Sequence, residues 1–210
     1  MVKCCFGGCE MKTLNRTFQK TTLVAGVGGA GTCILNHISH MFDQTVQFLV
    51  TDTNLKSLSR SVIKNQLQLG KNITKGQGCG GNTTIGKAAA LESTEEILNY
   101  FEGVEMVVII AGVGGGAGSA GTQVVAGIAK NMGLRVASIL VFPFDHEFGR
   151  EDQAKNTIEI MKSISDSVTV LYNSDLNHFK ERVPELDLRS AFGWQDMRVY
   201  EEIKKVIEAL

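Results

Sequence analysis

Three short glycine-rich segments in the 210-residue chain are the best candidates for binding an anion. They read GVGGAG, GQGCGG and GVGGGAGSAG at residues 26–31, 76–81 and 112–121, and together they hold 14 of the 23 glycines. None of them contains a charged residue. Glycine lets a phosphate approach the backbone closely, and the free N–H groups at the start of a following helix attract an anion. The segments therefore predict a polyphosphate site built from backbone N–H groups.

The elements that must position these segments alternate along the chain. Apolar runs predict strands at residues 21–25, 46–51, 66–69, 106–111, 135–142 and 167–172. Apolar residues at helical spacing predict helices at residues 32–41, 54–64, 85–101, 121–132, 152–164 and 187–210. This alternation predicts an α/β fold, a three-layer Rossmann-like parallel sheet that ends in a long helix. In such sheets ligands bind outside the carboxyl ends of the strands, where the first and third glycine segments fall.

Composition excludes several classes of function. Lys and Arg number 21 against 22 Asp and Glu, so the net charge of −1 argues against a nucleic-acid partner. No apolar run reaches the length of a membrane span, so we expect no direct membrane insertion. Five cysteines, an odd number, favour a reducing, cytoplasmic location. Residues 1–20 are expected to be a flexible tail, with a metal site at Cys4, Cys5 and Cys9 as the alternative.

Two other nucleotide-binding patterns compete with this interpretation. A dinucleotide-binding fingerprint, which would indicate an NAD-dependent oxidoreductase of Rossmann type, is matched by Gly26, Gly28, Gly31 and Asp52. That fingerprint leaves the third glycine segment unexplained. A lysine-bearing phosphate loop is approached at residues 81–88, but Ala88 stands where a magnesium-binding hydroxyl is needed. We therefore interpret Lys87 as a residue at the start of a helix.

Six segments resemble the tubulin/FtsZ superfamily, and within it the GTPase half of the bacterial FtsZ proteins. They are GVGGAGT (26–32), TKGQGCGGN (74–82), IIAGVGGGAGSAG (109–121), VFPFDHEFGR (141–150), YNSD (172–175) and AFGWQD (191–196). The resemblance implies a GTP-binding domain at residues 21–210 that uses GTP or GDP with Mg²⁺. It also implies a cell-division GTPase that assembles head to tail with homologous FtsZ-like subunits and hydrolyses GTP where two subunits meet.

The resemblance assigns a role to each candidate site residue. The residues implied to wrap the α- and β-phosphates are Gly28, Gly29, Ala30 and Gly31, followed by Thr32 and Cys33. Those implied to reach the γ-phosphate are Gly80, Gly81 and Asn82, and those implied to form the second phosphate wall are Gly115, Gly116, Ala117, Gly118 and Ser119. Glu147 would contact the ribose, with Arg150 near it. The residues implied to hold guanine are Asn173 and Asp196 at its edge and Phe192 stacked on its face.

The sequence also departs from the family's pattern. Residues 52–54 read Asp-Thr-Asn where the family has Asn-Thr-Asp, so the family's magnesium or ribose contacts do not carry over directly to these positions, and Asp52 is assigned only to nucleotide binding. Cys33 replaces an asparagine, Ala117 replaces a threonine, and Phe148 is either inserted or substituted between Glu147 and Gly149. The sequence ends at Leu210, so we expect the second domain and the catalytic loop to be absent, with no catalytic residue here. The expectation is slow hydrolysis, and the alternative is a non-catalytic subunit that caps filaments.

Overall fold

The computed structural model describes residues 21–43, 45–176 and 187–209. In these ranges six parallel strands form one sheet in the order β3-β2-β1-β4-β5-β6. The strands are β1 (Thr22–Val27), β2 (Val46–Asp52), β3 (Gln66–Gln68), β4 (Met106–Gly112), β5 (Arg135–Phe142) and β6 (Ser167–Tyr172). The strand order reverses between β1 and β4, which makes this the topological switch point where open α/β sheets bind ligands.

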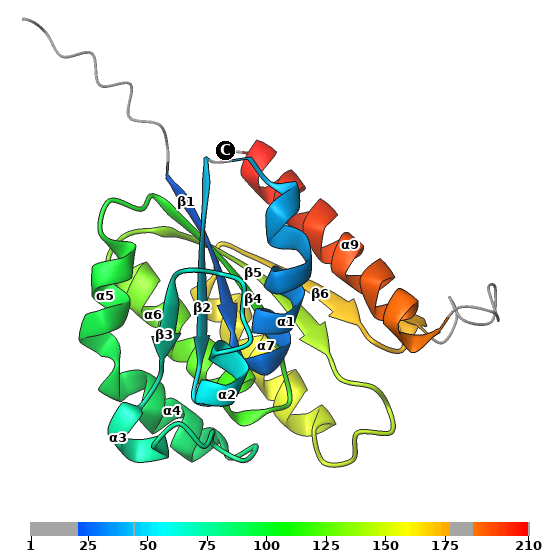
Figure 1. The fold of residues 1–210 in the computed structure, drawn as a ribbon, viewed down its shortest axis with the longest axis horizontal. Coiled ribbons are helices and arrows are strands. Elements are labelled where there is room, and N and C mark those ends of the chain that lie inside the picture. The colour runs from blue at the N-terminus through cyan, green and yellow to red at the C-terminus, as the bar shows by residue number, and fades with distance from the viewer. Residues whose placement is uncertain (1–20, 44, 177–186, 210) are drawn as a thin grey trace, which may run out of the picture.

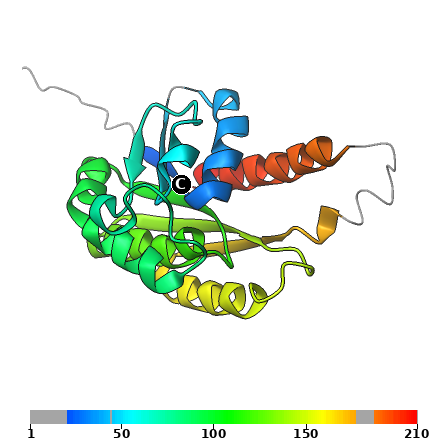
Figure 2. The same ribbon diagram turned by 60° about the horizontal axis from the view of Figure 1, so that its bottom comes forward.

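Helices cover both faces of the sheet (Figures 1 and 2). One face carries α1 (Gly28–Ile38), α2 (Leu55–Leu58) and α9 (Leu188–Glu208), with the short η1 (Ser39–Met41) after α1. The other face carries α4 (Thr83–Glu92), α5 (Thr94–Phe101), α6 (Thr122–Asn131) and α7 (Glu151–Ile164). Two short pieces complete the described fold, α3 (Lys71–Thr74) and the π-helix η2 (Gly116–Gly121). The predicted three-layer α/β fold is therefore confirmed.

A hydrophobic core lies on each side of the sheet. Alternate residues of β1 point to opposite cores, so that Leu23 packs under α4–α7 whereas Val24 packs under α1 and α9. The first six residues of β4 are all buried, because helices cover both of its faces. This explains why the MVVIIA segment is an unbroken apolar run instead of an alternating one.

Two predicted helices are wrong in extent. The helix expected at 54–64 is only α2, because Asn36 Oδ1 accepts hydrogen bonds from Ser61 Oγ and Val62 N and holds the chain in a turn. The helix expected at 85–101 is two helices, α4 and α5, that meet at Ser93. Ser93 is buried, and its hydroxyl accepts a hydrogen bond from Gly70 N at 2.9 Å. In both places a contact distant in sequence overrides the local pattern.

The other predicted elements are found within a few residues of their expected ends. The helix expected at 32–41 begins earlier, at Gly28, because the first glycine segment is itself the first turn of α1. Among the described residues no helix is both long and apolar enough to cross a membrane. The predicted tail at residues 1–20, including Cys4, Cys5 and Cys9, lies outside the described residues.

Candidate functional site

The first and third glycine segments touch each other at the carboxyl ends of β1 and β4. Gly28 has a φ of +73°, and a Cβ atom on it would lie 2.9 Å from the backbone nitrogen of Gly118. A Cβ atom on Gly118 would lie only 2.1 Å from the carbonyl oxygen of Gly112. Both positions therefore require glycine, which brings the start of α1 against the start of η2 at the switch point.

The second glycine segment packs on the same place. A Cβ atom on Gly116 would lie 2.4 Å from Cys79 Sγ and 2.7 Å from the Asn82 carbonyl oxygen. Asn82 also begins α4, because its Oδ1 accepts a hydrogen bond from Ile85 N at 3.1 Å. All three glycine segments thus converge, as their shared chemistry predicted.

The third glycine segment is fixed from outside the cleft. Its residues Gly116–Gly121 form a π-helix, a rare element that is frequent at functional sites. Ser119 Oγ accepts a hydrogen bond from Gly114 N at 2.8 Å, and Ser119 N donates to the Gly115 carbonyl oxygen. Gln153 Nε2 on α7 donates to the same carbonyl at 2.8 Å. Ser119 therefore supports the segment from within, since it is fully buried and both its Oγ and its backbone N–H bond to residues of the same segment.

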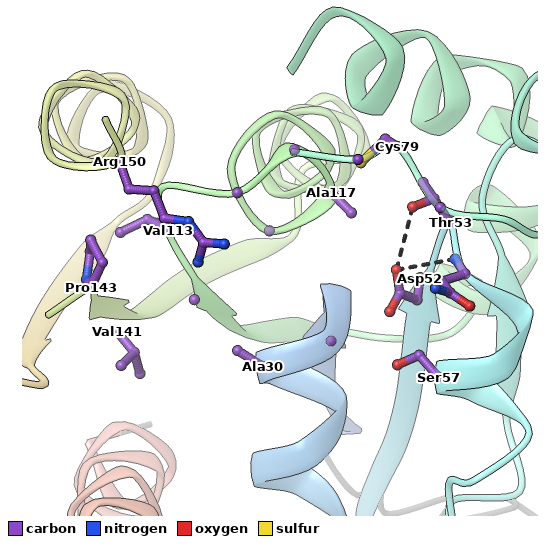
Figure 3. A pocket seen from close by; sticks show the side chains of 18 of the residues that line it. Ala30, Asp52, Thr53, Ser57, Cys79, Val113, Ala117, Val141, Pro143 and Arg150 are labelled. Atoms are coloured by element: carbon purple, nitrogen blue, oxygen red, sulfur yellow. Dashed lines mark hydrogen bonds between the residues drawn. The ribbon is translucent and has the colours of Figure 1, made fainter. Parts of the chain in front are cut away.

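A cleft of about 560 Å³ opens at this point (Figure 3). Pockets of this size hold small-molecule ligands and cofactors. Eleven of the predicted nucleotide-binding residues line it, namely Gly29, Ala30, Asp52, Gly80, Gly115, Gly116, Ala117, Gly118, Glu147, Arg150 and Asn173. Sequence reasoning missed the other lining residues, which are Thr53, Asn54, Ser57, Gln77, Gly78, Cys79, Gly112, Val113, Val141 and Pro143. Most of these lie within or beside the predicted segments. Their position in the sequence next to predicted site residues could therefore have indicated them.

Among the described residues, three charged side chains line the cleft, and two of them are acidic. Arg150 lies on one side and Asp52 on the other (Figure 3). Arg150 is ion-paired with Glu147, whose other carboxylate oxygen accepts a hydrogen bond from Phe144 N at 3.1 Å. The described side chains therefore contribute a net negative charge to the cleft. An anion there must be held by backbone N–H groups, by helix termini or by a bound cation.

Asp52 is the buried acid of the cleft, with a residue exposure of 5%. Burial raises the pKa of its carboxyl group above the ordinary value of 3.8, and hydrogen bonds from Ser57 and from the neighbouring backbone offset part of that effect. Asn54 N donates to Oδ1 at 3.3 Å. A carboxylate has the oxygen-donor chemistry that Mg²⁺ prefers, since Mg²⁺ is usually bound by one or two carboxylates together with substrate phosphates.

Of the residues assigned to the base, Asp196 and Phe192 lie on α9, whereas Asn173 follows β6. Asp196 is 6% exposed, and its Oδ2 lies 2.6 Å from His37 Nδ1 on α1. Burial raises the pKa of Asp196, and the hydrogen bond and charge of His37 act in the opposite direction. Phe192 lies one turn before Asp196, is 38% exposed, and makes an edge contact with Phe144 at 6.1 Å. Asp196 and Phe192 do not line the 560 Å³ cleft, whereas Asn173 does.

The remaining predicted residues lie on the periphery of the cleft. Thr32 and Cys33 face a separate groove of about 340 Å³ between α1 and α2. The Thr32 hydroxyl is buried and has no hydrogen-bond partner among the described residues. Gly31 packs against β4, where a Cβ atom would lie 2.4 Å from the Ile110 carbonyl oxygen. Gly81 has a φ of +79° and open space around it.

Comparison with known proteins decides which family shares this arrangement. Residues 5–181 match the model of the tubulin/FtsZ family, GTPase domain. The chain belongs to the tubulin/FtsZ family. It is 34% identical over 202 residues to the cell division protein FtsZ 1 of Thermococcus kodakarensis, covering 96% of this chain and 53% of that relative. It is 33% identical to the cell division protein FtsZ of Rickettsia conorii, covering 93% of this chain and 43% of that relative.

Solved tubulin/FtsZ structures share the fold. An empty FtsZ dimer from M. jannaschii superposes with a TM-score of 0.80 at 30% identity, covering 90% of this chain and 55% of that one. CetZ2 from Haloferax volcanii, solved as a GTPγS-bound protofilament, superposes with a TM-score of 0.78 at 20% identity, covering 90% of this chain and 58% of that one. The second likeness shows the fold alone. The chain spans about half the length of the relatives it matches.

Proposed function

We propose that the cleft at the three glycine segments binds a guanine nucleotide. The chain would then be the GTPase module of an FtsZ-like cytoskeletal protein that acts in filament assembly and cell division in the cytoplasm. The observation that carries the proposal is the contact of Gly28 with Gly118, which joins two strand-to-helix glycine segments at the switch point of a tubulin/FtsZ fold. Relatives of the chain bear the name cell division protein FtsZ.

The polyphosphate would lie along the backbone N–H groups of the three glycine segments. Residues 28–31, 80–81 and 115–118 would contribute these donors, whereas Asn82 N already donates to the Cys79 carbonyl oxygen and Asn82 would approach the phosphate with its side chain. Gly28 begins a helix whose dipole favours negative charge at its N-terminus. Because the cleft side chains carry more negative than positive charge, we propose that Mg²⁺ binds together with the phosphates. Asp52 would bind the Mg²⁺ ion on the side facing away from the phosphates. The ion would neutralise part of the phosphate charge.

Replacing Asp52 by asparagine is expected to weaken GTP binding in Mg²⁺ about tenfold, while binding in excess EDTA changes little. The reason is that a lost charge-assisted contact is worth about 1.5–3 kcal/mol. Isothermal titration of GTP with and without Mg²⁺ measures the effect. Equal weakening in both conditions would contradict the magnesium role.

The same acid predicts a pH dependence of nucleotide binding. The pKa of Asp52 is raised above 3.8 in the folded chain, so on acidification the carboxylate and its Mg²⁺ are lost at a higher pH than for an exposed aspartate. The effect of Asp52 on the free energy of unfolding has the opposite sign. Because its pKa is higher in the folded chain than in the unfolded chain, protonation of Asp52 favours the folded state, and this contribution is fully present below the pKa of the unfolded chain. Acidification should therefore release Mg²⁺-GTP from a chain that this group still helps to keep folded. Parallel binding and circular dichroism titrations measure both effects, and simultaneous loss would contradict the prediction.

Replacing Arg150 by alanine is expected to weaken GTP binding by roughly tenfold and guanosine binding hardly at all. Arg150 is the cationic side chain among those that line the cleft, and its guanidinium can reach a phosphate only if the nucleotide lies there. Lys155→Ala is the matched control, because Lys155 is an exposed cation one turn further along α7 that pairs with Glu151. Equal losses for GTP and guanosine would place the role of Arg150 elsewhere.

The base would lie at α9, where Asp196 would accept hydrogen bonds from the N1–H and 2-amino groups of guanine. Phe192 would stack on the ring, Asn173 would reach its edge, and Glu147 would contact the ribose. The one-turn spacing of Phe192 and Asp196 on α9 supports this, since residues four apart share one face of a helix.

For the 210-residue chain we propose slow hydrolysis, because the family places part of the catalytic machinery on a neighbouring subunit. Homologous subunits would stack head to tail on the cleft. A chain of these residues alone would release phosphate from GTP well below about one per second. Faster release by the pure chain would contradict this proposal. Substoichiometric inhibition of assembly of a full-length FtsZ would favour the alternative role of a filament cap.

One observation favours an NAD-dependent role as a second candidate. The strand order and the position of Asp52 at the end of β2 are shared with dinucleotide-binding folds. The two candidates differ in the third glycine segment, which only the guanine-nucleotide proposal uses. Denaturing the purified chain and identifying any released nucleotide tests the proposed function, with guanine nucleotide expected. Preferential release of NAD would contradict it.

A further inference from the structure

A histidine on α1 holds the acid that we assign to the base. His37 Nδ1 lies 2.6 Å from Asp196 Oδ2, and the two residues are 159 positions apart in the sequence. They are brought together because α1 and α9 pack side by side on the same face of the sheet (Figures 1 and 2). The His37 side chain is 56% exposed, whereas that of Asp196 is 8% exposed. The carboxyl group of Asp196 is thus the buried partner of this contact, and the imidazole of His37 is the exposed partner.

Asp196 has no other hydrogen-bond partner within the described part of the chain. Burial without partners would leave the carboxyl group both desolvated and free to rotate. The bond from Nδ1–H fixes Oδ2 and leaves Oδ1 unbonded. Each carboxylate oxygen can accept two hydrogen bonds, so Oδ2 still has a free lone pair. Both oxygens are therefore available to a ligand that presents two donors side by side.

We infer that His37 is a positioning residue that orients the Asp196 carboxylate for two neighbouring N–H donors and thereby sets the preference for guanine over bases with a single donor. This inference rests on the proposed function, because it concerns the base of the nucleotide proposed above. His37 itself needs no contact with the base. Among the described residues Cys33 is the other titratable group near Asp196. Burial raises the pKa of its thiol, and the negative charge of Asp196 raises that pKa further. At a pH below its raised pKa the thiol is neutral. His37 is therefore the side chain that donates a hydrogen bond to the acid.

The inference predicts a change in discrimination and not only in affinity. Inosine triphosphate lacks the 2-amino group of guanine, so it makes one hydrogen bond to Asp196 where GTP makes two. Without His37 the carboxylate loses its fixed orientation and the second bond becomes weaker. The ratio of GTP to inosine triphosphate affinity should then fall about tenfold in His37→Ala, because one charge-assisted bond is worth about that factor.

The experiment measures this ratio by titration in four chains. They are the 210-residue chain itself, His37→Ala, His37→Asn, whose amide nitrogen can replace Nδ1, and His40→Ala, a control at a nearby exposed histidine. We expect a reduced ratio in His37→Ala alone, and recovery in His37→Asn. If His37 had only a structural role, His37→Ala would lower the affinities for GTP and for inosine triphosphate equally. That result would overturn the inference. Tighter GTP binding in His37→Ala would also overturn it, since His37 would then be blocking the acid.

Measurements on the chain without substitutions distinguish failure of the proposed function from failure of this inference alone. If that chain shows no preference for GTP over inosine triphosphate, the proposed function fails and this inference fails with it. If it prefers GTP and His37→Ala keeps the full ratio, only this inference fails. Should His37→Ala not fold, His37→Asn is compared with His37→Gln, whose amide lies one bond further out. An equal ratio in those two variants would then overturn the inference.

Discussion

Replacing Asp196 by asparagine is expected to convert a site for GTP into a site for xanthosine triphosphate. The asparagine amide would face the 2-amino group of guanine donor to donor, whereas it could donate to the 2-oxo group of xanthine. Two charge-assisted hydrogen bonds are lost for GTP, so its affinity should fall by at least about a hundredfold. Competition titrations with the two nucleotides measure the switch.

The matched control for this change is Glu201→Gln, which removes one negative charge from an exposed position of the same helix. It should leave both affinities unchanged. Equal affinity of Asp196→Asn for both nucleotides would mean that Asp196 does not touch the base. The 2.6 Å contact with His37 would then serve only to pack α1 on α9.

Two alanine substitutions in the third glycine segment are expected to separate folding from binding. Gly115 has an extended backbone with a φ of −102°, and a Cβ atom on it would meet nothing within 4 Å. Because Gly115 lines the cleft, the methyl group of Gly115→Ala should enter the proposed phosphate site. We expect at least about tenfold weaker GTP binding, as one overpacked contact costs about 1–3 kcal/mol. The melting temperature should stay unchanged.

Gly118→Ala should lower both stability and binding. A Cβ atom there would lie 2.1 Å from the Gly112 carbonyl oxygen, so the backbone of β4 or η2 must shift. We expect a loss of at least about 1–3 kcal/mol in the free energy of unfolding. Gly127→Ala in α6 is the control, because a Cβ atom on Gly127 would meet nothing within 4 Å. Alanine in place of glycine inside a helix should raise the free energy of unfolding by about 0.5–1 kcal/mol. Thermal melts and GTP titrations of all three variants give the comparison, and normal GTP binding by Gly115→Ala would exclude the phosphate from this segment.

The strands and the glycine segments could be predicted because their signals are local. A buried parallel strand such as β4 is an apolar run, and the turn that follows it needs glycines whatever the rest of the chain does. The contact of Gly28 with Gly118 follows from the parallel order, which brings both segments to one sheet edge. The convergence of these two glycine segments could therefore be predicted from the sequence.

The features that sequence reasoning missed depend on contacts between distant residues. The end of α2 depends on Asn36, and the break between α4 and α5 on a hydrogen bond from Gly70 to Ser93. No local pattern predicted that residues 116–121 form a π-helix. Gly116 at its start packs against Cys79, and the preceding Gly115 accepts a hydrogen bond from Gln153 on α7. The pairing of His37 with Asp196 has no local signal at all, because only the packing of α1 on α9 creates it.

The central claim is that a guanine nucleotide lies on the glycine segments at the switch point. The most direct test is an amide NMR titration of the emptied 22.7 kDa chain with GTP, ATP and NAD in turn. GTP should shift the amide signals of residues 28–31 and 115–118 at the lowest concentration, together with those around Asp196 on α9. Shifts that leave these glycine amides unmoved, or that occur first with NAD, would contradict the account.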